Sequence, residues 1–266
     1  MRNRVISALI MLPLLILIYI GGWALLALCF AASIAGIKEF FHAFENKGIK
    51  PSFGIVCASL SCLYLLNIYI YYLGDNNTDW YLYLLWLIIS VSLSFFNTFR
   101  LTERSLEDSM VTLAGIVYIG FFGVHMVFMD QSANDGLFVW LILITSLGTD
   151  IMAYVSGKTI GKHKLCPNIS PKKTVEGAIG GVIGSVGFCA LFGFLLMPEL
   201  IMHCIVLGVL GGLISQLGDL TASAIKRNLG VKDFSSLIPG HGGIMDRIDS
   251  ILFTAPLVYY YTALLL

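Results

Sequence analysis

Long apolar runs separated by short polar segments constrain the fold of this 266-residue chain more than any other feature. At 1.5 Å per residue, a helix of about 20 apolar residues spans the roughly 30 Å hydrocarbon core of a bilayer. Hydrophobic residues make up 58% of the sequence and charged residues only 12%, which lies outside the range of soluble proteins. We therefore predict an all-α, polytopic transmembrane helix bundle.

The apolar runs predict about nine membrane-spanning helices, the first of which follows Arg2 and Arg4. A cleavable signal peptide also begins with basic residues, but the first double run is too long for one apolar signal core. We expect a single integral membrane unit, with N-terminal helices in residues 1–109 and a catalytic region in residues 110–266. The predicted helices are Val5–Ile20, Trp23–Phe41, Phe53–Leu73, Trp80–Phe99, Met110–Met129, Leu137–Gly157, Gly177–Met197, Leu200–Ile225 and Ile244–Leu266.

The distribution of charge predicts the orientation of the helices. If the N-terminus is cytoplasmic, all 16 Lys and Arg residues fall on cytoplasmic loops or helix ends, as the positive-inside rule requires. Two long basic segments, 158–176 and 226–243, then face the same compartment. We expect a multi-pass protein of the cell (inner) membrane whose active site opens to the cytoplasm. The opposite loops carry only acidic charges, namely Asp75, Asp79, Asp130, Asp135 and Glu199.

The stretch from Ser223 to Asp249 concentrates polar chemistry between two apolar segments. Its cations and carboxylates together indicate a site for phosphate and a metal ion, and its glycines allow close backbone approach to a ligand. A solvated loop between two membrane helices is the alternative. The cations are Lys226, Arg227, Lys232 and Arg247, and the carboxylates are Asp233, Asp246 and Asp249.

The other basic segment contains two adjacent lysines beside a helix start. Ser170 and Pro171 are residues typical of a helix N-cap and first turn, so Lys172 and Lys173 are predicted in the first turn of the next helix. Cations there oppose the helix dipole unless an anion binds, which favours a nucleotide phosphate. Lysines that only set the topology or touch lipid headgroups are the alternative. Small-residue spacing indicates close helix packing at a set of glycines, namely Gly177, Gly180, Gly181, Gly184 and Gly187.

Carboxylates within apolar helices are costly and indicate function. Asp219, Ser223 and Lys226 share one helix face, and Asp246 and Asp249 are three residues apart on the last helix. Oxygen ligands suit magnesium, which takes one or two carboxylates together with phosphates and water. A charge-neutralising network with Lys226 and Arg247 is the alternative. Asp150 also lies in an apolar helix, and for it the alternative is an ion pair with Lys158.

These motifs resemble the signature of the phosphatidate cytidylyltransferases, or CDP-diacylglycerol synthases, over the C-terminal half of the chain. The matching residues are Ser223, Lys226-Arg227, Lys232-Asp233, His241-Gly242-Gly243 and Asp246-Arg247-x-Asp249, with Ser170 to Gly177, Asp150, Ala153-Tyr154 and Gly157-Lys158. The resemblance implies transfer of CMP from CTP to phosphatidic acid, giving CDP-diacylglycerol and pyrophosphate. It also implies a homodimer in the lipid bilayer, and we expect no nucleic-acid partner.

The resemblance, taken with the chemistry of the side chains, gives the residues of these motifs expected roles. Asp219, Asp246 and Asp249 would hold Mg²⁺, or Mg²⁺ and a second cation, and the catalytic set would be Ser223, Lys226, Asp246 and Asp249. Phosphate groups would be bound by Lys172, Lys173, Lys226, Arg227, His241 and Arg247. A CTP-dependent lipid kinase and an anionic-lipid transporter are the alternatives, although we find no inverted repeat of the kind typical of transporters.

Overall fold

The computed structural model describes residues 13–73, 80–99, 104–132, 136–237 and 242–266. Within these ranges, seven helices are long and apolar enough to cross a membrane, and Tyr81–Phe96 is a shorter apolar helix. The predicted polytopic helix bundle is confirmed. The helix expected at Val5–Ile20 begins outside the described residues, and its part from residue 13 to residue 20 is helical.

The chain divides into two compact units. Unit 1 consists of Met1–Val127 and Asp233–Arg247, and unit 2 consists of Phe128–Lys232 and Ile248–Leu266. The described residues of the second segment, 233–237 and 242–247, therefore pack with the N-terminal helices, although they lie late in the sequence. The last helix, α10 (Met245–Leu265), starts in unit 1 and continues in unit 2.

Unit 1 is built on helices whose apolar residues pack around a buried core. At the π-helix η2, small residues let neighbouring helices approach: a Cβ at Gly115 would lie 2.8 Å from the ring of Phe41. The start of α5 is fixed by a capping box between Ser105 and Asp108. The elements are α2 (Gly22–Glu45), α3 (Phe53–Leu73), α4 (Trp80–Phe96), η1 (Asn97–Phe99), α5 (Leu106–Ala114), η2 (Gly115–Phe121) and most of α6 (Phe122–Asp130).

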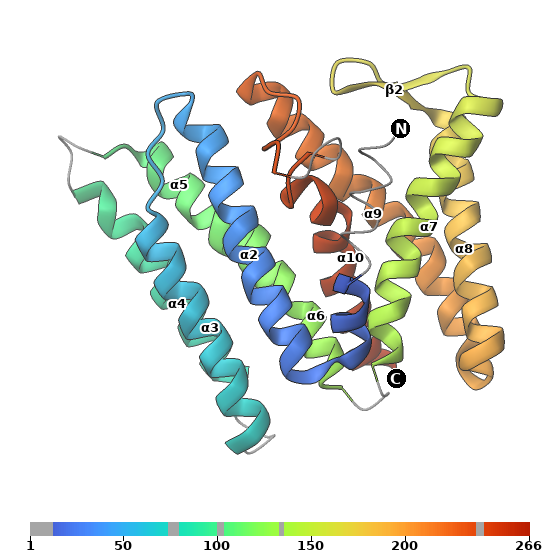
Figure 1. Ribbon diagram of the computed structural model, residues 1–266, viewed down its shortest axis with the longest axis horizontal. Helices are drawn as coiled ribbons and strands as arrows, with labels where there is room; N and C mark the ends of the chain where they lie inside the picture. The colour runs from blue at the N-terminus through green and yellow to red at the C-terminus, as the bar shows by residue number, and fades with distance from the viewer. Residues whose placement is uncertain (1–12, 74–79, 100–103, 133–135, 238–241) are drawn as a thin grey trace. The chain divides into compact units, whose positions relative to one another are not determined.

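Unit 2 is a helical layer in which α7 (Leu137–Thr159), α8 (Val175–Leu196) and α9 (Ile201–Leu229) pack against one another (Figure 1). The short helix η3 (Pro198–Leu200) joins α8 to α9. Glycines on α8 face α7 closely: a Cβ at Gly177 would lie 2.8 Å from the carbonyl oxygen of Ala153, and one at Gly181 would lie 3.0 Å from the Ala153 Cβ. The predicted packing role of these glycines is confirmed, except that Gly187 faces open space.

A two-stranded antiparallel hairpin, β1 (Lys164–Cys166) and β2 (Ser170–Thr174), connects α7 to α8 and lies at the ends of these helices (Figure 1). The prediction that Lys172 and Lys173 lie in the first turn of a helix is wrong, because both lie on β2. The helix starts later because Thr174 is its N-cap, and its Oγ1 accepts a hydrogen bond from the Gly177 N–H. The first turn then carries the acidic Glu176, whose charge favours a helix N-terminus.

Candidate functional site

A cavity of about 340 Å³ lies within unit 2, bordered by the hairpin and the ends of α7, α8 and α9. Three ammonium groups line it, from Lys158 on α7 and from Lys172 and Lys173 on β2. Two carboxylates line it as well, from Asp150 on α7 and Asp219 on α9. The cavity therefore brings together cations and anions that lie up to 69 residues apart in the sequence, from 150 to 219.

The depth of the cavity follows from its lining on α7. Asp150 lies nine residues before the last residue of that helix, Thr159, which corresponds to about 13 Å along the helix axis. The cavity therefore reaches from the polar hairpin into the part of α7 that is apolar enough to lie in a membrane. Such a cavity can hold an anionic group of a water-soluble molecule close to an anionic group of a lipid.

Lys173 and Asp219 form an ion pair inside this lining, with 2.5 Å between Nζ and Oδ2. The side chains are only 27% and 31% exposed, so water screens the pair incompletely. One turn further along α9, the Ser223 hydroxyl lies 3.4 Å from the other Asp219 oxygen and donates to it. Asp219 is thus oriented from both sides, with its pairing partner on β2.

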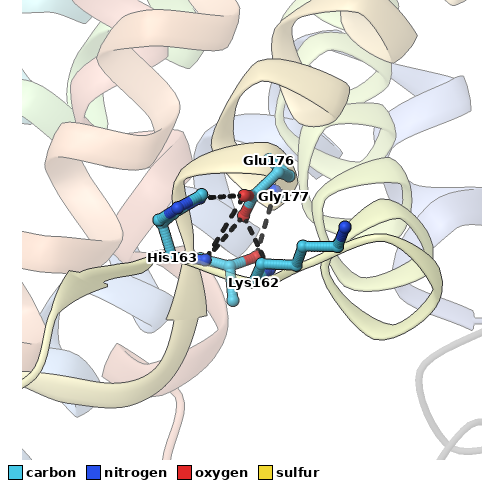
Figure 2. Close-up of polar contacts among 5 residues, drawn as sticks. Lys162, His163, Glu176 and Gly177 are labelled. Atoms are coloured by element: carbon cyan, nitrogen blue, oxygen red, sulfur yellow. Dashed lines mark hydrogen bonds and ion pairs between the residues drawn. The ribbon is translucent and has the colours of Figure 1, made fainter.

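The hairpin is held against the start of α8 by Glu176 (Figure 2). Its carboxylate accepts hydrogen bonds from the backbone N–H groups of Lys162 and His163, at 3.0 and 3.2 Å, and lies 2.6 Å from Nδ1 of His163. These bonds hold the segment that leads into β1. Since β2 carries Lys172 and Lys173, the clamp helps to fix the lysines of the cavity.

Arg227 ties the other end of the hairpin to α9. Its Nε donates to the carbonyl oxygen of Ile169 at 3.1 Å, and its Nη1 donates to that of Val231 at 3.2 Å. The side chain is exposed and does not line the cavity. The guanidinium therefore connects the turn before β2 with the end of α9, beside the cavity rather than in it.

Asp249 and Lys226 form a second charged group in unit 2, and both are buried. The charges that act on Asp249 are the carboxylates of Asp219 and Asp150 and the ammonium of Lys226. Close helix packing brings α10 to this place, because a Cβ at Gly218 would lie 2.6 Å from the backbone oxygen of Asp249. Asp249 is therefore near Asp219, although it does not line the cavity itself.

Asp246 belongs to unit 1, where it organises the loop before α10. Its Oδ2 accepts hydrogen bonds from the backbone N–H groups of Phe234, at 3.0 Å, and Gly243, at 2.9 Å. Gly242 has φ of 85°, a conformation that favours glycine, and a Cβ there would lie 2.9 Å from the same oxygen. Gly242 is thus explained by its close approach to the Asp246 carboxylate.

The structure does not test the predicted roles of His241 and Arg247 in phosphate binding. His241 lies outside the described residues. Arg247 is exposed on the first turn of α10, and its backbone N–H donates to the carbonyl oxygen of Ile244.

Sequence reasoning missed Glu39, a buried carboxylate on α2 that binds the loop before α10. The signal was present, because a carboxylate followed by Phe40 and Phe41 near the end of an apolar helix is costly unless it has partners. It also missed Gln216, which lines the cavity and donates from Nε2 to the carbonyl oxygens of Ala178 and Gly212.

The carboxylates of unit 2 fit a magnesium ion that also takes ligands from phosphate and water. Among the residues that the structure describes, no group of three or more His, Cys, Asp or Glu side chains could hold a metal ion by itself. Magnesium is commonly bound by one or two carboxylates with phosphate oxygens and water completing its shell. Asp219 and the neighbouring Asp249 supply two carboxylates, and the lysines beside Asp219 suit the phosphate that such a site needs.

Comparison with known proteins gives one consistent result. Residues 2–265 match the model of the cytidylyltransferase family. The chain is 36% identical to the phosphatidate cytidylyltransferase of Synechocystis sp., with 99% of this chain and 97% of that protein covered. It is 31% identical to the enzyme of the same name from Bacillus subtilis, with 99% and 98% covered. It is 33% identical to the phosphatidate cytidylyltransferase of Staphylococcus haemolyticus, with 96% of this chain and 95% of that protein covered.

Proposed function

The chain belongs to the cytidylyltransferase family, and on that premise we propose that it is a phosphatidate cytidylyltransferase. It is a CTP-using nucleotidyltransferase and a multi-pass integral membrane protein. The reaction converts CTP and phosphatidic acid into CDP-diacylglycerol and pyrophosphate. The observation that carries the proposal is the cavity in which Lys158, Lys172 and Lys173 meet Asp150 and Asp219 at the end of apolar helices.

The chemistry requires charge neutralisation more than proton transfer. An oxygen of the phosphatidate phosphate forms a bond to the α-phosphorus of CTP, and the bond from that phosphorus to the oxygen bridging to the β-phosphate breaks. The electron pair of the broken bond leaves with pyrophosphate. Since the attacking phosphate is already anionic, the enzyme needs alignment and stabilisation of the departing charge rather than a side-chain base.

The lysines of the cavity suit that task. Lys172 and Lys173 on β2 and Lys158 on α7 offer three positive charges, which would bind the triphosphate and then stabilise pyrophosphate. The depth of the cavity along α7 allows the lipid phosphate to approach from the membrane. Lys226 and Arg227, on the last turn of α9, would add positive charge beside the cavity.

Magnesium, when bound, would polarise phosphate oxygens and so lower the cost of negative charge at the α-phosphorus and on the leaving group. Asp219, Asp246 and Asp249 would hold it, with or without a second cation. Lys173 and Ser223 orient the Asp219 carboxylate. Ser223 would in addition position a phosphate, as would His241 and Arg247.

The proposal also includes the surroundings of the site. The site opens to the cytoplasm, because the positive-inside rule then places all basic segments on that side. The protein works as a homodimer in the bilayer and has no nucleic-acid partner.

Product analysis with labelled CTP tests the function. The detergent-solubilised protein is supplied with phosphatidic acid, magnesium and CTP labelled either at the α-phosphate or at the γ-phosphate. We expect the α label in the lipid product and the γ label in pyrophosphate. A γ label in the lipid would identify a lipid kinase instead and would refute the proposal.

A further inference from the structure

Glu39 on α2 makes three hydrogen bonds to the segment that contains the start of α10. Its Oε1 accepts from the Ser235 hydroxyl at 2.7 Å and from the Ile244 backbone N–H at 3.0 Å. Its Oε2 accepts from the Met245 backbone N–H at 2.9 Å. The side chain is buried, at 7% exposure for the residue, so these bonds are protected from water.

The position of these donors gives the carboxylate a function in the fold. Met245 is the first residue of α10, and backbone N–H groups at a helix start have no partner within the helix. A negative charge at this end of a helix is also favoured by the helix dipole. Glu39 therefore caps the start of α10 from α2, because its carboxylate accepts from both of these N–H groups.

Two further contacts show that α2 and this segment are fitted to each other. The rings of Phe40 and Phe234 lie 5.9 Å apart, centroid to centroid. A Cβ at Gly243 would overlap the Glu39 carboxylate, so only glycine allows the approach. The second glycine of the His-Gly-Gly motif is thus required by a residue about 200 positions earlier in the sequence.

The same segment holds Asp246. The Asp246 carboxylate accepts from the backbone N–H groups of Phe234 and Gly243, and Gly243 directly precedes Ile244, which donates to Glu39. Loss of the Glu39 bonds would release the backbone that Asp246 binds. The orientation of Asp246 therefore depends on the Glu39 carboxylate through the backbone that both residues bind.

We propose that Glu39 is a positioning residue: it fixes the start of α10 and thereby holds the Asp246 carboxylate in its working orientation. The kinetic part of this inference rests on the proposed function, in which Asp246 is a metal ligand. The structural part does not depend on the reaction. The inference also gives α2, which carries none of the residues that resemble the family signature, a role in the site.

The first test compares Glu39→Gln with Glu45→Gln in the full-length protein, by hydrogen exchange in detergent. Glutamine must present an NH₂ group to at least one of the three donors, whereas Glu45 is exposed on the same helix and provides a matched control. We expect the Ile244 and Met245 amides to exchange about ten to a hundred times faster in Glu39→Gln, the effect of losing a charge-assisted hydrogen bond. Amides of α7 and α8 should be unchanged. Ser235→Ala, which removes one donor, should give a smaller increase at the same amides.

The second test separates positioning from folding by kinetics. In Glu39→Gln we expect kcat to fall at least about tenfold, while the KM for CTP stays within about twofold, because the lysines of the cavity belong to α7 and β2. Glu45→Gln should match the wild type in both constants.

The outcomes are distinct. The inference would be overturned if the Ile244 and Met245 amides of Glu39→Gln exchanged at wild-type rates. It would also be overturned if amides throughout the protein exchanged faster and the fraction of active enzyme fell to the same extent as kcat. If the wild-type protein forms no CDP-diacylglycerol, the proposed function fails, and hydrogen exchange still decides whether Glu39 fixes the start of α10.

Discussion

The ion pair between Lys173 and Asp219 leads to a prediction about CTP binding. Lys173→Met keeps much of the length and apolar volume of the side chain but removes its charge from the cavity. We expect the KM for CTP to rise, because a cation that would bind the triphosphate is lost. Lys173 is the better choice than Lys172, since its Nζ has a defined position 2.5 Å from the Asp219 Oδ2.

The size of the effect follows from the burial of the pair. A charge-assisted contact is worth about 1.5–3 kcal/mol. Because the two side chains remain 27% and 31% exposed, we use the lower part of this range, about 1.5–2 kcal/mol. At about 1.4 kcal/mol per factor of ten, the KM for CTP should rise about ten- to thirtyfold.

Steady-state kinetics with CTP as the varied substrate measures this change. Lys164→Met is the matched control, since Lys164 is an exposed lysine of β1 that does not line the cavity. The control should keep the KM of the wild type within about twofold. Equal KM values for Lys173→Met and the wild type would show that Lys173 does not bind the nucleotide, and would leave it the ion pair with Asp219.

Three more predictions follow from the same structure. Asp246→Asn keeps an oxygen for the two backbone donors but loses the charge. Activity should therefore fall at least about a hundredfold, which corresponds to about 2.7 kcal/mol of activation free energy, in protein that stays folded and monodisperse. Near-normal turnover with unchanged magnesium dependence would remove Asp246 from the mechanism. Gly177→Ala should lower the free energy of unfolding by about 1–3 kcal/mol through overpacking against α7, and with it the thermal unfolding temperature. Gly187→Ala, whose added Cβ has nothing within 4 Å, should not lower that temperature, and equal unfolding temperatures for the two variants would refute the packing argument. A cysteine at Asn168, in a variant without the six native cysteines, should react with a membrane-impermeant reagent only from the cytoplasmic side, and labelling only from outside would reverse the topology.

The helices could be predicted from the sequence because hydrophobicity along the chain fixes them almost alone. The start of α8 could not, because the choice between Ser170 and Thr174 as the N-cap depends on the hairpin. Pairing of β1 with β2 places Cys166 opposite Ser170, so Ser170 is part of a strand and cannot cap the helix. Pro171 is equally compatible with the first turn of a helix and with an edge strand, so the local pattern was ambiguous.

The site was predictable in part for a similar reason. Asp219 was identified from its charge in an apolar helix, and Lys173 from a helix start that the structure places later, and the cavity brings the two side chains together. Glu39 was missed because two of its three partners are the backbone N–H groups of Ile244 and Met245, which cannot be recognised from side-chain types. A carboxylate that binds backbone from a distant helix can be recognised from sequence only by its cost in an apolar segment.

Lysine footprinting with CTP tests the central claim, that the cavity of unit 2 binds the triphosphate. The protein is acetylated with and without CTP and magnesium, and the modified lysines are quantified by mass spectrometry. We predict that CTP protects Lys158, Lys172 and Lys173, while Lys164 reacts equally in both samples. Equal modification of all three cavity lysines at CTP concentrations that saturate turnover would contradict the account.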